Sequence, residues 1–151
     1  MLFMLFYYRG AGVNAMVAML LNIAILLGAM SYFRATLTLP GIAGIILTVG
    51  VGIDSNVLVF ERIREELRAG NLPAPAVDTS FRRVFITLVD THLAALLSAA
   101  FLFIFGTGAI KGFAVTLVIG LVSNMFTSIF VSRTLFEFVL RWRGRGGTLS
   151  I

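Results

Sequence analysis

The sequence contains no cysteine and few charged residues. Without cysteine, neither a disulfide framework nor a thiolate metal site can form. Only 13% of the 151 residues are charged, whereas 59% are hydrophobic. Soluble domains carry about 25% charged residues and about 45–50% apolar ones. The composition therefore excludes an ordinary soluble domain and predicts a single helical domain embedded in a lipid bilayer.

Signatures of catalysis and of nucleic-acid binding are also missing. The sequence has no glycine-rich phosphate loop, no nucleophile–base pair and no H-E-x-x-H zinc motif. The net charge is +5, but the arginines fall mostly at the ends of apolar runs, where membrane topology explains them. We therefore expect no enzymatic activity, no cofactor, no metal site and no nucleic-acid partner.

Long apolar runs are what the sequence does contain. About 20 apolar residues span a bilayer as a helix, and four runs reach that length. The first eight residues cover only about 12 Å of a roughly 30 Å hydrocarbon core, so we interpret them as the tail of a truncated span. The predicted fold is an all-α, polytopic transmembrane bundle with four full spans plus the end of a truncated one. The predicted segments are residues 1–8, 11–33, 39–60 (continuing to 69), 84–105 and 112–140.

Positive charges are distributed unevenly between the two sides of this predicted bundle. If the first segment ends on one side, that side collects ten arginines and the other collects only Arg34 and Lys111. Cytoplasmic loops of membrane proteins carry the excess of Arg and Lys. The pattern predicts that the 61–83 connection and the C-terminus are cytoplasmic. The ten arginines are Arg9, Arg62, Arg64, Arg68, Arg82, Arg83, Arg133, Arg141, Arg143 and Arg145.

The predicted cytoplasmic connection carries its own helix signals. Residues 61–69 should continue the preceding span as a helix, because acids and arginines there recur at spacings of three and four residues. Gly70 is typical of a helix C-terminus. Pro73 and Pro75 should break the chain, so that the next helix begins at residue 78.

Two acids, Asp54 and Asp90, lie inside the predicted spans. Each is about two helical turns from the cytoplasmic end, on successive helices that run in opposite directions. A charge inside a span costs from about 2.5 to well over 10 kcal/mol, and such residues usually face a bundle interior or a wet cavity. Because burial disfavours the charged form of a carboxyl group, each acid is a candidate proton relay. The alternative is that each merely hydrogen-bonds a neighbouring helix.

Four uncharged polar residues are candidates for supporting roles at these acids: Asn56, His92, Asn124 and Ser128. Asn124 and Ser128 can donate hydrogen bonds to a buried carboxylate. His92 lies two residues beyond Asp90, about 200° around the helix, so the two do not share a face. It is either a proton relay or a satisfied hydrogen-bonding residue. No metal-ligand spacing accompanies it.

Small residues at every fourth position mark two helix faces. Rows of this kind let helix backbones approach closely and place Ser, Thr and Asn at the interface. We therefore expect both rows to be packing surfaces. One row consists of Gly44, Thr48 and Gly52, and the other of Gly112, Thr116, Gly120, Asn124, Ser128 and Ser132.

The motif GIDSNVLVFERIREELR (residues 52–68) resembles the fourth-helix signature of SecD proteins in the SecD/SecF family of protein-export membrane proteins. The flanking segments LTLPGIAGIILTVG and FGTGAIKGFAVTLVIGLVSNMFTSIFVSR are similar to the corresponding SecD segments. The resemblance covers essentially all 151 residues. It implies a fold like that of the resistance–nodulation–division (RND) transporters, with six transmembrane helices and a large extracytoplasmic domain. The chain matches the end of the second helix through the sixth, and the extracytoplasmic domain is absent from it.

The resemblance also implies a function and a set of partners. SecD proteins pair with SecF and use the proton-motive force to complete translocation of preproteins delivered through the SecYEG channel of the bacterial plasma membrane. The family's proton-pathway residue falls on Asp54, and Asp90 matches a recurrent fifth-helix acid. Where this chain has His92, the family more often has Asn, which argues against a dedicated proton role for His92.

Two other functions stay open at this point. One is a proton-driven small-molecule exporter of the RND superfamily, which would have a different external domain. The other is a structural subunit in which every polar residue only holds helices together, so that neutral substitutions of Asp54 and Asp90 would have no effect.

Overall fold

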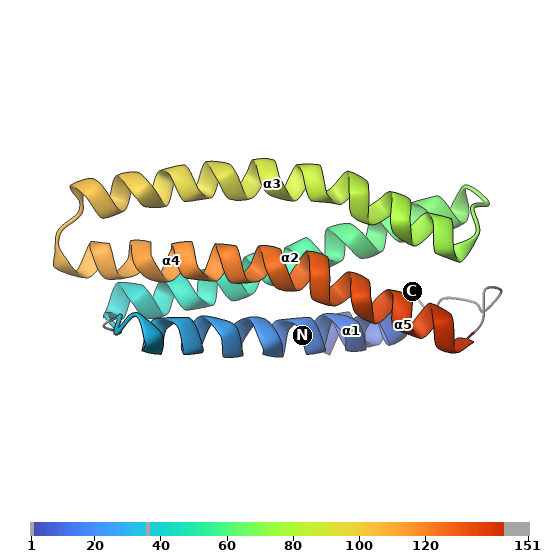
Figure 1. Ribbon diagram of the computed structural model, residues 1–151, viewed down its shortest axis with the longest axis horizontal. Coiled ribbons are helices and arrows are strands. Elements are labelled where there is room, and N and C mark those ends of the chain that lie inside the picture. The colour runs from blue at the N-terminus through green and yellow to red at the C-terminus, as the bar shows by residue number, and fades with distance from the viewer. Residues whose placement is uncertain (1, 36, 144–151) are drawn as a thin grey trace.

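The computed structural model describes residues 2–35 and 37–143, and all regular secondary structure within them is helical. Long helices lie side by side along one axis (Figure 1). The helices form four long rods, and each rod contains a stretch that is long and apolar enough to cross a membrane. This confirms the predicted all-α bundle. The rods are α1 (Leu2–Tyr32), α2 (Leu39–Arg68), α3 (Pro73–Phe105), and the series α4 (Gly108–Phe126), π-helix η1 (Thr127–Val131) and α5 (Ser132–Arg143).

Helix α1 contains no loop where the sequence predicted a boundary. Helical backbone continues through Arg9 and Gly10, and the stretch that qualifies as a membrane span is Gly10–Tyr32. A single glycine costs a helix only about 1 kcal/mol relative to alanine. Tyr8 and Ala11, on either side of this pair, are buried in one core cluster. The burial of Tyr8 and Ala11 therefore outweighs the tendency of Gly10 to interrupt the helix.

The connection between α2 and α3 is shorter than predicted. Helix α2 ends at Arg68, and Gly70 follows with a φ of +87°, as the sequence predicted. Pro73 begins α3 instead of breaking the chain, so the prediction of a start at residue 78 was wrong. The first four N–H groups of a helix have no partner within it, so Pro73 and Pro75 lose no hydrogen bond there.

The two rows of small residues face each other across the contact between α2 and α4. A Cβ atom added at Gly120 would lie 2.5 Å from Cγ2 of Thr48. One added at Gly52 would lie 3.1 Å from Oδ1 of Asn124. The prediction that these rows are packing surfaces is confirmed, and the close approach brings the polar side chains of both rows together.

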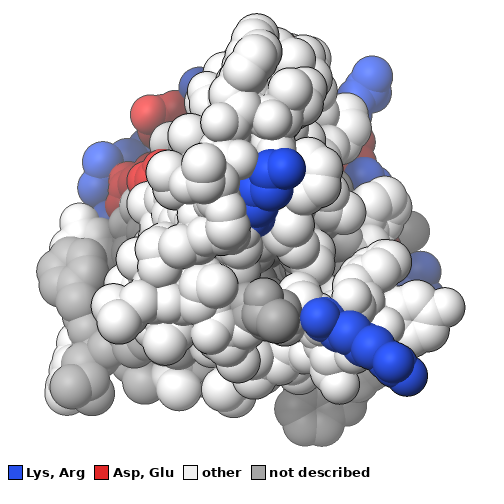
Figure 2. Space-filling model, turned by 90° about the vertical axis from the view of Figure 1, so that its left-hand side faces the viewer, with Lys and Arg blue, Asp and Glu red and all other residues white. Residues whose placement is uncertain are grey.

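The apolar core divides into two parts along the bundle. The larger part lies toward the α2–α3 connection and includes Phe60, Ile63 and Phe81, whereas a smaller one around Ala99 and Leu121 joins α3 to α4. Figure 2 looks onto the opposite end of the bundle, where the α1–α2 and α3–α4 connections lie and most of the surface is uncharged.

Candidate functional site

A cluster of four buried polar side chains joins α2, α3 and α4 inside the bundle. These residues, called the polar cluster below, are Ser55, His92, Asn124 and Ser128. Nδ1 of His92 lies 2.8 Å from the backbone oxygen of Leu88, so this nitrogen is the donor and Nε2 is left as an acceptor. The hydrogen-bond pattern therefore makes His92 a neutral imidazole.

Asn124 is the centre of the polar cluster. Its Nδ2 carries two hydrogens, and it lies 3.2 Å from both Nε2 of His92 and Oγ of Ser55. Its Oδ1 accepts a hydrogen bond of 2.9 Å from Ser128. All polar atoms of this amide are thus satisfied by side chains from three different helices, which fixes how α2, α3 and α4 are set against one another.

Two further hydrogen-bonded groups tie α1 and α2 to the last rod. Oγ of Ser132 donates to Oδ1 of Asn56 at 2.8 Å, and Nδ2 of Asn14 donates to the backbone oxygen of Ser132 at 3.1 Å. Oγ of Ser123 donates to Oδ1 of Asn22 at 2.6 Å. All five side chains are buried. The bundle interior is therefore held by neutral amides and hydroxyls as well as by apolar packing.

The π-helix η1 keeps the polar face of the last rod pointing inward. In an α-helix, residues four apart drift by about 40° around the axis at each step. The wider turns of η1 offset this drift, because a π-helix bonds each residue to the fifth one along. Asn124, Ser128 and Ser132 are consequently all buried on one face. Nothing in the composition of this segment predicted the π-helix.

Neither of the two predicted proton carriers belongs to the polar cluster. Asp54 and Asp90 are both exposed on the outer surface of the four rods, whereas Ser55, Leu88 and His92 beside them are buried. Among residues 2–35 and 37–143, neither acid forms a hydrogen bond or an ion pair. The structure thus brings together His92, Asn124 and Ser128, three of the predicted supporting residues, with Ser55, which sequence reasoning missed. Both acids face away from this cluster.

The two acids nevertheless lie at a similar depth in the bundle. Asn124 links Ser55 of α2 to His92 of α3, so these residues are level with each other. Asp54 lies one residue before Ser55 and Asp90 two residues before His92. Because α2 and α3 run in opposite directions, these offsets add to a difference in depth of about 4.5 Å. The predicted similar depth of the two carboxyl groups is therefore present, although each lies on its own outer face.

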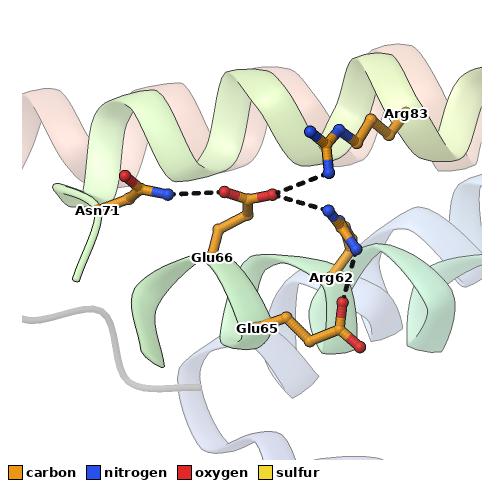
Figure 3. Close-up of polar contacts among 5 residues, drawn as sticks. All are labelled: Arg62, Glu65, Glu66, Asn71 and Arg83. Atoms are coloured by element: carbon orange, nitrogen blue, oxygen red, sulfur yellow. Dashed lines mark hydrogen bonds and ion pairs between the residues drawn. The ribbon is translucent and has the colours of Figure 1, made fainter. Parts of the chain in front are cut away.

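A second polar network closes the end of the bundle where α2 meets α3 (Figure 3). Glu66 accepts from Arg62 at 2.9 Å and from Asn71 at 2.7 Å, and it lies 3.5 Å from Arg83 of α3. Arg62 also pairs with Glu65 at 2.8 Å. The i,i+4 pair of Arg62 and Glu66 agrees with the spacing of acids and arginines predicted for residues 61–69. This network attaches the end of α2, the turn and the first part of α3 to one another.

The sequence matches the family model described as "Protein export membrane protein SecD/SecF, C-terminal" over residues 1–142. A protein translocase subunit SecD from Koribacter versatilis is 59% identical over 150 residues, which are 99% of this chain and 28% of that protein. The corresponding subunit from Syntrophobacter fumaroxidans is 52% identical over the same shares. The chain thus spans between a quarter and a third of the length of these relatives.

A solved structure shares the arrangement of helices. The crystal structure of SecDF from Thermus, described as a translocon-associated membrane protein, matches with a TM-score of 0.90 and 44% sequence identity. The match covers 93% of this chain and 20% of the SecDF chain. The likeness in both sequence and helix packing extends over nearly the whole chain.

Proposed function

This chain belongs to the SecD/SecF family of protein-export membrane proteins, and we propose that it is the membrane-embedded part of a SecD-like subunit that uses the proton-motive force to promote preprotein translocation. Asp54 is the principal proton carrier in this proposal, and Asp90 assists it. The names of the relatives, which are protein translocase subunits, favour protein export over small-molecule export.

The observation that carries the proposal is the position of Asp54. This acid lies on a membrane-spanning helix, level with the polar cluster, and its side chain is exposed outside the four rods. An ionised carboxylate facing hydrocarbon is strongly unfavourable, so it needs a polar partner from outside these helices or a bound proton. Protonation removes the charge and therefore changes what the outer face of α2 can pack against.

A change at Asp54 would spread through the contacts of α2. Ser55, the next residue, accepts a hydrogen bond from Asn124 of α4, and Asn124 also donates a hydrogen bond to His92 of α3. The glycine and threonine contacts between α2 and α4 leave little space for one helix to move without the other. We propose that α2, α3 and α4 respond together to protonation and transmit this movement to an extracytoplasmic domain.

The proposed partners are a SecF-like subunit, the SecYEG channel and the translocating preprotein. The SecF-like subunit would cover the outer face of α2 and supply the polar environment of Asp54. The excess of arginine at the α2–α3 connection and at the end of α5 supports a cytoplasmic location for these parts in the bacterial plasma membrane.

The decisive experiment replaces Asp54 by asparagine in the full-length protein. Translocation of a preprotein into inverted membrane vesicles is followed with and without a proton gradient. We expect Asp54→Asn to abolish the proton-dependent part of translocation while leaving assembly with the partner subunit intact, and Asp90→Asn to reduce it. Asp78→Asn is the matched control, because Asp78 is an exposed acid near the start of α3, paired with Arg133.

Near-normal export by the Asp54→Asn protein, at normal protein levels, would show that this acid carries no proton for translocation. Equal losses for Asp54→Asn and Asp78→Asn would point to a general effect of removing a carboxylate. Co-purification of the partner subunit with each variant separates a defect in proton coupling from a defect in assembly.

A further inference from the structure

A groove with a cavity volume of about 380 Å³ runs between α3 and the η1–α5 segment. Its apolar walls include Phe85, Ile86 and Phe130, all of which are exposed. Two arginines, Arg82 and Arg133, line it as well. The groove is thus amphipathic, with cationic and apolar side chains on the same surface.

The two arginines differ in how they are satisfied. Arg133 is held by Asp78 at 2.9 Å and by Glu137 at 2.8 Å. Within the described residues, Arg82 forms neither a hydrogen bond nor an ion pair, and it is exposed. Arg82 therefore provides the positive charge at the groove that no carboxylate neutralises.

The groove lies at the end of the predicted span 84–105, where lipid headgroups would give way to hydrocarbon. Arg82 comes two residues before the apolar run that starts at Val84 and fills the rest of α3. Phe85 and Ile86 follow within the next turn, on the side of the groove that leads into the span. A ligand suited to this site has one anionic group at the interface and a hydrocarbon chain that extends into the membrane.

We propose that this groove binds an anionic phospholipid from the leaflet on the arginine-rich side of the membrane. The lipid phosphate contacts Arg82 first and Arg133 second, and an acyl chain lies against Phe85, Ile86 and Phe130. A zwitterionic lipid fits less well, because no unpaired carboxylate beside Arg82 is available to bind its cationic group. The groove shares no residue with the two proposed proton carriers, Asp54 and Asp90.

Lipid binding to the full-length protein in detergent tests this proposal. Native mass spectrometry measures the affinity for phosphatidylglycerol and for phosphatidylcholine with the same acyl chains. We expect the wild-type protein to prefer phosphatidylglycerol and Arg82→Gln to weaken its binding about fivefold. Phe130→Ala should weaken both lipids. Arg68→Gln is the matched control, because Arg68 is an exposed arginine at the end of α2 that does not line the groove.

Three outcomes would overturn the proposal. The first is equal affinity of the wild-type protein for the two lipids, and the second is an equal loss in Arg82→Gln and Arg68→Gln, which would indicate a diffuse charge effect. The third is the absence of a retained lipid, as expected if a protein segment fills the groove. We expect that inorganic phosphate added as a competitor does not displace the lipid. Displacement of the lipid by phosphate would also overturn the proposal, because it would indicate a site for the phosphate group alone.

Discussion

Replacing Gly120 by alanine tests how closely α2 and α4 pack. The added Cβ atom would lie 2.5 Å from Cγ2, 2.7 Å from Cβ and 2.8 Å from Oγ1 of Thr48. Thr48 is only 1% exposed, and its Oγ1 donates to the backbone oxygen of Ile45 at 2.9 Å. Rotation of the Thr48 side chain would leave its Cβ in place, so only a separation of the two helices relieves the overlap.

The size of the effect follows from three contributions, two that destabilise the protein and one that stabilises it. Overpacking a well-packed interior costs typically about 1–3 kcal/mol. Replacing glycine by alanine within a helix returns up to about 1 kcal/mol through its higher helix propensity. Separation of the helices would also stretch the bond from Asn124 to Ser55, and bonds of this kind contribute about 0.6 kcal/mol on average in a membrane. We expect a net destabilisation of about 1–3 kcal/mol.

Unfolding of the purified protein by a denaturing detergent measures this difference. Gly50→Ala is the matched control, because Gly50 lies in α2 with no atom within 4 Å of an added Cβ. Combining Gly120→Ala with Thr48→Gly should recover much of the lost stability, since the opposing side chain is then removed. If Gly120→Ala and Gly50→Ala unfold alike, the close contact between α2 and α4 is refuted.

Three further substitutions probe the polar contacts. His92→Leu removes the acceptor for Asn124 and should lower the free energy of unfolding by about 0.6–1.7 kcal/mol, with a smaller loss for His92→Asn, in the same unfolding assay. Ser132→Ala leaves Oδ1 of the buried Asn56 without its 2.8 Å partner, and we expect a loss of about 1–3 kcal/mol by that measurement. Glu66→Gln weakens the contacts to Arg62 and Arg83 and should cost about 1 kcal/mol or less, with a difference from wild type that shrinks as salt is raised; a salt-independent difference would contradict an ionic contribution.

The helices and their packing rows could be predicted because both depend on local patterns. Span length follows from the run of apolar residues, and the faces of Gly44, Thr48 and Gly52 follow from the helical repeat. Pro73 was misread because proline marks both the end of one helix and the first turn of another. Which of the two applies depends on how soon the next helix begins, and only two residues separate Gly70 from Pro73.

The partners of the buried polar residues lay beyond sequence reasoning. Asn124 and His92 are 32 residues apart, and Ser55 is 69 residues from Asn124, so their meeting depends on which helices are neighbours. The depth of Asp54 and Asp90 could be predicted, since depth follows from chain length along a helix. The direction in which each acid points could not, because a face is buried or exposed only relative to the helices around it.

The contrast between the buried and the exposed polar groups has a physical basis. Amides and hydroxyls can be fully satisfied by one another inside the bundle, as Asn124 is, and they hold one arrangement of helices. A carboxyl group that must gain and lose a proton cannot be held in that way, because bonds that suit its charged form oppose its neutral form. An acid on an outer face, such as Asp54, can change its surroundings when its charge changes, while the polar cluster behind it keeps α2 joined to α3 and α4. Asparagine at position 54 should therefore leave the bundle folded and remove only its response to protons.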